Sequence, residues 1–165
     1  MPIIKSLQQR ILRMVKKDQE IMKSGKRGKK EEEIIKKNTE EMRSIIKEYG
    51  WPGISLVGKK GAEAVWLLVQ HSDRDLNFQK KCLALMREAV KKKEASKVNL
   101  AYLTDRVLVN SGKKQIYGTQ IYKNKEGQFL PRPIYDKKEL DKRRKSFGLP
   151  PLKEYIEKIK EMSLK

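Results

Sequence analysis

The sequence predicts a mainly α-helical protein with about six helices and one β-hairpin. Two patterns support this fold class: apolar residues recur three and four positions apart through most of the chain, whereas one later segment is rich in β-branched and aromatic residues. The length of 165 residues suits one hydrophobic core, and no internal repeat or long linker interrupts the chain. We therefore expect residues 1–165 to form a single domain.

The first half of the chain predicts three helices. Apolar residues at helical spacing run from Ile4 to Lys23, and a basic loop at residues 24–31 ends the pattern. A second helix is expected from about Glu31 to Tyr49, because its acidic first turn suits the positive end of the helix dipole. After a turn at residues 50–53, the segment from Ala62 to His71 is apolar on nearly all sides, which predicts a central helix covered by its neighbours.

The second half predicts further helices and the hairpin. Ser72–Asp75 has the form of a capping box, which would start a helix that continues to about Lys93. Another helix is expected from Val98 to Asn110. Residues 115–131 are rich in strand formers around a turn sequence, and this pattern is typical of a β-hairpin. The tail predicts two short helices on either side of residues 147–151.

The net charge of +19 is the strongest compositional feature. A basic protein attracts phosphates, so non-specific binding of nucleic acid is one partner interaction that we expect. However, the basic residues are spread along the chain apart from the run from Gly25 to Lys30. Most of them are Lys, whereas base recognition favours Arg, so the composition is also typical of a solvated, Lys-rich surface.

Other features restrict the class of protein. No stretch reaches the ~18 consecutive apolar residues of a membrane span, and charge begins at Lys5, so we expect a cytoplasmic protein without a membrane partner. The lone Cys82 forms no internal disulfide, and the single His excludes a two-His metal site. Phosphate loops, nucleophile elbows and zinc-protease motifs are missing. The sequence identifies no cofactor and leaves the oligomeric state open.

Polar residues interrupt the apolar stripes of several predicted helices. Asp18, with Gln19 beside it, replaces an apolar residue in the first helix, and Asn38 and Gln79 do the same in later helices. Buried charges must be paired and hydrogen-bonded, so these groups should contact one another or a ligand. The first alternative is a structural network that fixes helix register; the second is a pocket with these residues as its supporting polar core.

The candidate site lies between the predicted central helix and the hairpin. His71 would be the acid or base, oriented by Asp105 or Asp73, and Asp105 is the second catalytic candidate. The candidate ligand-binding residues are polar groups suited to a phosphate-bearing or other anionic small ligand, namely Arg106, Gln115, Tyr117, Thr119, Gln120, Arg143 and Arg144. Because a His at a helix C-terminus commonly caps free carbonyls, a structural role of His71 is the alternative.

Two other functions remain open from the residues. One is a nucleic-acid-binding module that acts through residues 5–30 and Lys91–Lys93, with an affinity that falls steeply with salt. The other is a protein-interaction domain with a structural polar core, in which the exposed edge of the hairpin pairs with a partner.

Several motifs together resemble a bacterial domain family of unknown function. They are Tyr49-Gly50-Trp51-Pro52, Leu68-Val69-Gln70-His71, Ala101-Tyr102-Leu103-Thr104-Asp105-Arg106, Tyr117-Gly118-Thr119-Gln120 and Arg143-Arg144 followed by Gly148-Leu149. The resemblance extends from Asp18-Gln19 to Tyr155. It implies a cytoplasmic helical domain and the same polar residues, and it implies no substrate.

Overall fold

The computed structural model describes residues 2–25 and 28–165, in two units that are treated one by one. The first unit ends at Ser96 and the second begins at Lys97. Within the described residues the structure has seven α-helices, one 3-10 helix and one two-stranded sheet, which confirms the mainly α fold with a hairpin. The single domain over residues 1–165 stays a prediction.

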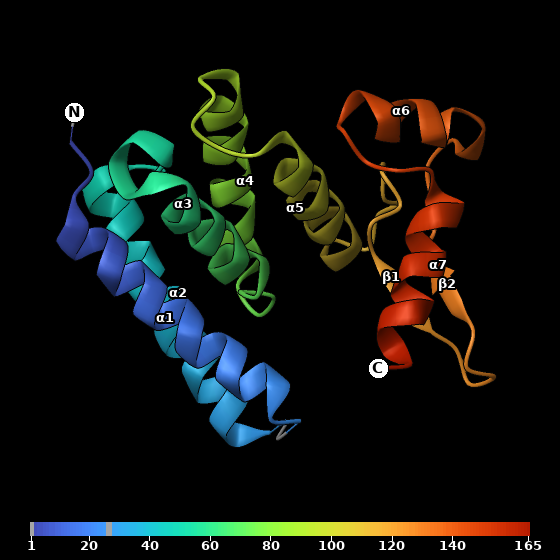
Figure 1. The fold of residues 1–165 in the computed structure, drawn as a ribbon, viewed down its shortest axis with the longest axis horizontal. Coiled ribbons are helices and arrows are strands. Elements are labelled where there is room, and N and C mark those ends of the chain that lie inside the picture. The colour runs from blue at the N-terminus through green and yellow to red at the C-terminus, as the bar shows by residue number, and fades with distance from the viewer. Residues whose placement is uncertain (1, 26–27) are drawn as a thin grey trace. The chain divides into compact units, whose positions relative to one another are not determined.

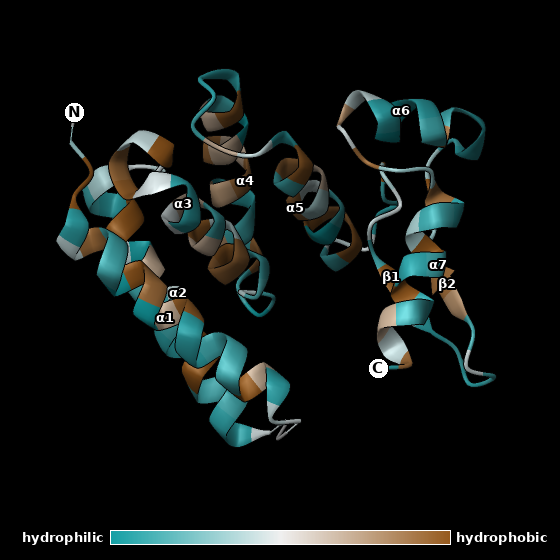
Figure 2. Ribbon diagram, viewed as in Figure 1, coloured by the Kyte–Doolittle hydropathy of each residue, from teal (hydrophilic) through white to brown (hydrophobic). Residues whose placement is uncertain are grey.

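The first unit consists of four helices: α1 (Lys5–Lys23), α2 (Lys29–Tyr49), α3 (Ile54–Gln70) and α4 (Leu76–Lys91). In this unit α1 packs against both α3 and α2 (Figure 1). The buried residues of α1 follow the predicted stripe and are Leu7, Ile11, Met14, Asp18 and Ile21. Figure 2 shows apolar segments along α1 separated by hydrophilic ones, as an amphipathic helix requires.

Helix α3 begins at Ile54, eight residues before the central helix that the sequence predicted. The additional residues at the start of α3 are joined to the rest of this helix at Gly58. The φ of Gly58 is 72°, which is left-handed and marks a kink in the helix. A Cβ at this position would lie 2.8 Å from Nε2 of Gln8 on α1. That amide donates to the carbonyl of Val57 at 2.8 Å, so the kink lets α1 approach the start of α3 closely.

The predicted capping box at Ser72–Asp75 is wrong in its detail. Asp75 is the N-cap of α4, and its Oδ1 accepts a hydrogen bond from the Phe78 amide at 2.9 Å. The Ser72 hydroxyl instead donates backwards, to the carbonyl of Leu68 in the last turn of α3. Ser72 therefore ends one helix and Asp75 starts the next, with the tight turn between them.

The second unit contains α5 (Lys97–Asn110), strands β1 (Ile121–Lys123) and β2 (Phe129–Pro131), a 3-10 helix η1 (Lys137–Glu139), α6 (Leu140–Ser146) and α7 (Leu152–Ser163). The strands are antiparallel, with Tyr122 opposite Leu130. Helix α7 packs against β2 and α6. The two short tail helices on either side of residues 147–151 are confirmed.

The hairpin is shorter than predicted because residues 115–120 form a loop instead of a strand. Gln115 makes only an isolated bridge with Ile134. Three amides of the loop bond to the Asp105 side chain, so they are not available for a strand ladder. Gly118 has a φ of 67°, which an extended strand does not accommodate. A side chain from α5 thus replaces the expected strand partner.

The basic loop predicted at residues 24–31 is only partly described. Lys26 and Arg27 lie outside the described residues, and α2 begins at Lys29, inside the predicted loop. Among the described residues, none of the helices combines the length and apolar character needed to cross a membrane.

Candidate functional site

His71 and Asp18 form a hydrogen-bonded pair in the first unit. The Nδ1 atom of His71 lies 2.7 Å from Oδ2 of Asp18. With the Asp18 carboxylate ionised, so that it only accepts hydrogen bonds, Nδ1 carries the proton that joins the two residues. In the neutral ring Nε2 is then unprotonated and can accept a proton. This is the arrangement of a general base with an orienting carboxylate.

The Asp18 carboxylate is buried and incompletely paired. Asp18 is 1% exposed, as its place on the apolar stripe of α1 predicts. Its Oδ2 also accepts from Nε2 of Gln19 at 3.2 Å, whereas Oδ1 has no hydrogen-bond partner among the described residues. A buried carboxylate with one unsatisfied oxygen is costly, and such groups are uncommon outside functional sites.

His71 follows the last turn of α3, and neighbouring helices hold that turn in place. From α2, the Thr39 hydroxyl donates to Ser72 Oγ at 2.9 Å. From α4, Nε2 of the fully buried Gln79 lies 3.2 Å from the carbonyls of Val69 and Gln70 in the last turn of α3. The Val69 carbonyl also accepts from the Ser72 amide at 3.1 Å. Gln79 therefore caps carbonyls at the end of α3, the role that a structural His71 would have had. The imidazole of His71 is directed to Asp18 instead.

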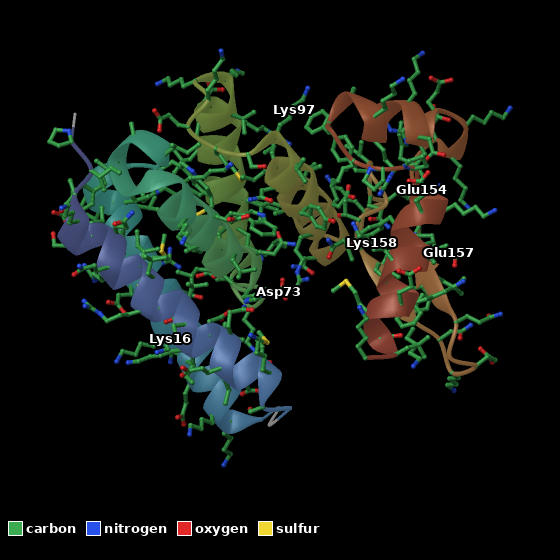
Figure 3. The ribbon with its side chains drawn as sticks, viewed as in Figure 1. Lys16, Asp73, Lys97, Glu154, Glu157 and Lys158 are labelled. Carbon is green, nitrogen blue, oxygen red and sulfur yellow. The ribbon has the colours of Figure 1, made fainter. Side chains whose placement is uncertain are left out.

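A hollow of about 200 Å³ lies next to His71. It is lined by residues from the first turn and a half of α2 and from the turn after α3, namely Glu31, Glu32, Ile35, His71, Asp73 and Arg74. Figure 3 labels Asp73 in this turn. Arg74 forms an ion pair with Glu32, and both residues also line a neighbouring hollow of about 380 Å³. With a side chain that is 18% exposed, His71 is accessible from solvent.

Asp105, in the second unit, has its carboxylate fully occupied. The residue is 0% exposed. Oδ1 accepts from the amides of Ile116 and Tyr117 at 2.8 and 3.0 Å, and Oδ2 accepts from the amide and hydroxyl of Thr119, each at 2.9 Å. Four donors satisfy both oxygens. The catalytic role stays a prediction; the bonding supports a positioning role for Asp105, which shapes the loop.

Gln115 and Thr119 contribute to the same loop. The Gln115 amide donates to the carbonyls of Gln120 and Arg132 at 3.0 and 2.9 Å, and its oxygen accepts from the Gln120 amide at 2.9 Å. Gln115 is 0% exposed and Thr119 is 4% exposed. Both were predicted to bind a ligand, which stays untested; their bonds and burial support a structural role in holding the loop.

Two arginines of α6 hold the other side of this loop. Arg144 is 0% exposed and donates to the carbonyls of Pro150 and Tyr117, each at 2.6 Å, while its guanidinium lies 5.0 Å from the Tyr155 ring centroid. Burial lowers the pKa of Arg144 from its ordinary value. Arg143 donates to the carbonyl of Ile116 at 3.0 Å. The guanidinium groups proposed as an anion clamp are thus bonded to backbone carbonyls.

Arg106 and Gln120 are brought together in a more accessible place. Nη1 of Arg106 lies 3.5 Å from Oε1 of Gln120, which is long for a hydrogen bond. Both residues are half-buried, as is Tyr117, whose ring packs against Phe147 with centroids 4.5 Å apart. Arg106, Tyr117 and Gln120 are therefore the predicted ligand-binding residues that still present side chains at the surface of the second unit.

The structure shows the partner of His71 and adds residues to the polar networks. The carboxylate bonded to His71 is Asp18, whereas the sequence predicted Asp105 or Asp73 as the orienting residue. Thr39, Ser72 and Tyr155 belong to the polar networks, the last through a bond from its hydroxyl to the Thr119 carbonyl at 3.1 Å. In the part of the chain that the structure describes, no three His, Cys, Asp or Glu side chains are grouped so that they could hold a metal ion.

Comparison with known proteins gives a family. The model of a family of unknown function, DUF6624, matches residues 5–164. The chain belongs to DUF6624. No curated protein and no solved structure matches it. Membership of DUF6624 agrees with the uncharacterised domain family that the motifs predicted. The bacterial origin stays a prediction, and membership of DUF6624 implies no ligand.

Proposed function

We propose that the chain is an enzyme in which His71 transfers a proton to or from a bound small molecule. One observation carries the proposal: a partly accessible imidazole is held at 2.7 Å by a carboxylate that is itself 1% exposed, next to a hollow of about 200 Å³. A His–Asp pair with a purely structural role could be buried in the core and would not need to line a hollow.

Asp18 supplies orientation and charge in this mechanism. Its bond to Nδ1 fixes the tautomer that leaves Nε2 as the base, and its negative charge stabilises the imidazolium that forms when Nε2 accepts a proton. Asp18 itself needs no proton transfer. Such acid–base catalysis contributes roughly 10²–10⁴ in rate.

The charged residues around the hollow limit which chemical group of a ligand can lie next to His71. Glu31, Glu32 and Asp73 line it together with one cation, Arg74, which is paired with Glu32. A phosphate placed here would be repelled by these carboxylates. We therefore expect the ligand to present a hydroxyl or an amine to His71, in place of the phosphate-bearing or other anionic group predicted from the sequence.

A thermal-shift screen tests the proposal. The probes are three sets of compounds: amines such as spermidine, neutral polyols and phosphate esters. A compound that binds only the folded protein raises its melting temperature, and binding at His71 must disappear in His71→Gln. We expect stabilisation by an amine or a polyol in the wild type and none in the variant. Equal stabilisation of both proteins by every active compound would contradict the site.

Anion binding at Arg106 is a second candidate function, favoured by the place of Arg106 beside Gln120 at the surface of the second unit. Nη1 of Arg106 lies 3.5 Å from Oε1 of Gln120, and both residues are half-buried. Guanidinium and amide groups side by side suit a phosphate or carboxylate. Titration with pyrophosphate should show binding that Arg106→Gln removes and that a change at the exposed Arg132 leaves intact.

A further inference from the structure

A basic groove runs along α1 and α2 in the first unit, separate from the hollow at His71. Its volume is about 700 Å³. Four cations line it, namely Arg10, Arg13, Lys17 and Lys37. Arg10 is paired with Glu41 at 2.9 Å, whereas among the described residues no ion pair includes the other three. Two carboxylates, Glu40 and Glu41, also line the groove, so its four cations leave the lining with a net charge of +2.

An unsatisfied buried amide forms part of the lining of this groove. Asn38 is 6% exposed, and its Nδ2 has no hydrogen-bond partner in the described part of the chain. Leaving such a donor without a partner costs about 1–3 kcal/mol. An acceptor oxygen in the groove would remove this cost, and the cations that surround Asn38 favour an anionic oxygen.

The cations lie in a row suited to a chain of negative charges. Arg10, Arg13 and Lys17 are three and four residues apart, so they share one face of α1. At about 1.5 Å of rise per residue they cover about 10 Å of the helix axis. A stacked strand with the geometry of duplex DNA places a phosphate about every 3.4 Å along the helix axis, so this length matches about three phosphates of such a strand.

We propose that this groove binds the phosphodiester backbone of a single nucleic-acid strand without recognising its bases. Lys17, Lys37 and Arg13 contact phosphates, and the Asn38 amide donates to a phosphate oxygen. The residues that line the groove include no aromatic side chain, so stacking of bases is absent. A groove between two adjacent helices, with axes about 8–10 Å apart, admits a single strand more readily than a duplex.

The net charge of +19 attracts any polyanion, so the test must separate the groove from the general surface. The chain offers a matched pair of double variants. Lys17→Gln with Lys37→Gln removes two groove cations, whereas Lys16→Gln with Lys36→Gln removes their sequence neighbours, which are exposed and do not line the groove. Lys16 is labelled on α1 in Figure 3. Both variants lower the net charge equally.

The experiment measures binding of fluorescein-labelled oligothymidine and oligouridine by anisotropy over a range of salt concentrations. We expect the groove variant to bind about tenfold more weakly and its salt slope to fall by about 0.7 for each lost phosphate contact, with less than about a twofold change in the neighbour variant. Both oligonucleotides should bind alike, and His71→Gln should bind like the wild type. Equal weakening of both double variants, tighter binding of a duplex, or no binding would overturn the proposal.

Discussion

Asp18 and Asp105 are both buried carboxylates, yet the structure uses them differently. Asp105 accepts four hydrogen bonds from one loop, and neither oxygen is left over. Asp18 accepts two on one oxygen, from His71 and Gln19, and the described residues give its other oxygen no donor. The difference shows that burial alone does not identify a functional residue. A carboxylate saturated by the donors of one loop shapes the fold, whereas one that holds an accessible imidazole next to a hollow is available for chemistry.

The largest expected effect is on stability when Asp105 is changed. In Asp105→Asn the amide Nδ2 faces the amide and hydroxyl donors of Thr119, so hydrogen bonds are lost and a buried donor becomes unsatisfied. We expect the free energy of unfolding to fall by about 4 kcal/mol, measured by urea denaturation. Asp18→Asn should lose less, about 1–2 kcal/mol. A larger loss at Asp18 would reverse the comparison.

The arginines of the second unit give the next contrast. Arg144→Gln leaves the carbonyls of Tyr117 and Pro150 without their donor inside the protein, and we expect a loss of about 3 kcal/mol. Arg106→Gln changes a half-buried residue whose Nη1 lies 3.5 Å from Oε1 of Gln120, and its loss should stay below about 1 kcal/mol. Melting temperatures of the two variants provide the measurement. Similar decreases would show that Arg106 is as architectural as Arg144.

Alkaline pH should weaken the folded state in both units. Burial raises the pKa of the Cys82 thiol from 9.0 to about 12, and burial also raises the pKa of Tyr155. The unfolded chain therefore loses these protons first, so stability present at neutral pH is lost as the pH rises above the ordinary pKa values. For Cys82 the loss is about 2 kcal/mol between about pH 9 and pH 11.

Urea denaturation of the wild type and of Cys82→Ala across this pH range tests whether the Cys82 thiol causes this loss of stability. The variant should lose stability less steeply with pH, because the contribution of the Cys82 thiol is gone. Parallel curves would show that the Cys82 thiol does not contribute.

The smallest effect on stability is expected at the candidate catalytic residue. His71→Gln should change the free energy of unfolding by less than about 1 kcal/mol, because Gln can donate to Asp18 and the end of α3 is held by Gln79 and Ser72. Circular dichroism during thermal unfolding measures the change. A loss of several kcal/mol would assign His71 a structural role.

The sequence predicted the elements more reliably than the partners of their side chains. Helical spacing places Asp18, Asn38 and Gln79 inside because these positions interrupt apolar stripes, and all three are buried. The same spacing does not tell which groups bond together, because Asp18 and His71 lie 53 residues apart and are joined only by the packing of α1 on α3.

The loop at residues 115–120 shows most clearly where prediction from the sequence fails. Its β-branched and aromatic residues predict a strand, yet the donors of that segment are taken by Asp105, so a tertiary contact overrides the local preference. Ser72 and Asp75 are a similar case, since the capping pattern is present and a different member of it caps the helix.

The tautomer of His71 tests the central claim most directly. His71 is the one His of the chain, so its ring nitrogens give a single, unambiguous set of signals in long-range ¹H–¹⁵N correlation spectra. The account predicts that in the neutral ring the proton lies on Nδ1, with Nε2 unprotonated, and that Asp18→Asn removes this preference. A proton on Nε2 in the wild type, or a spectrum that Asp18→Asn leaves unchanged, would contradict the proposed pair.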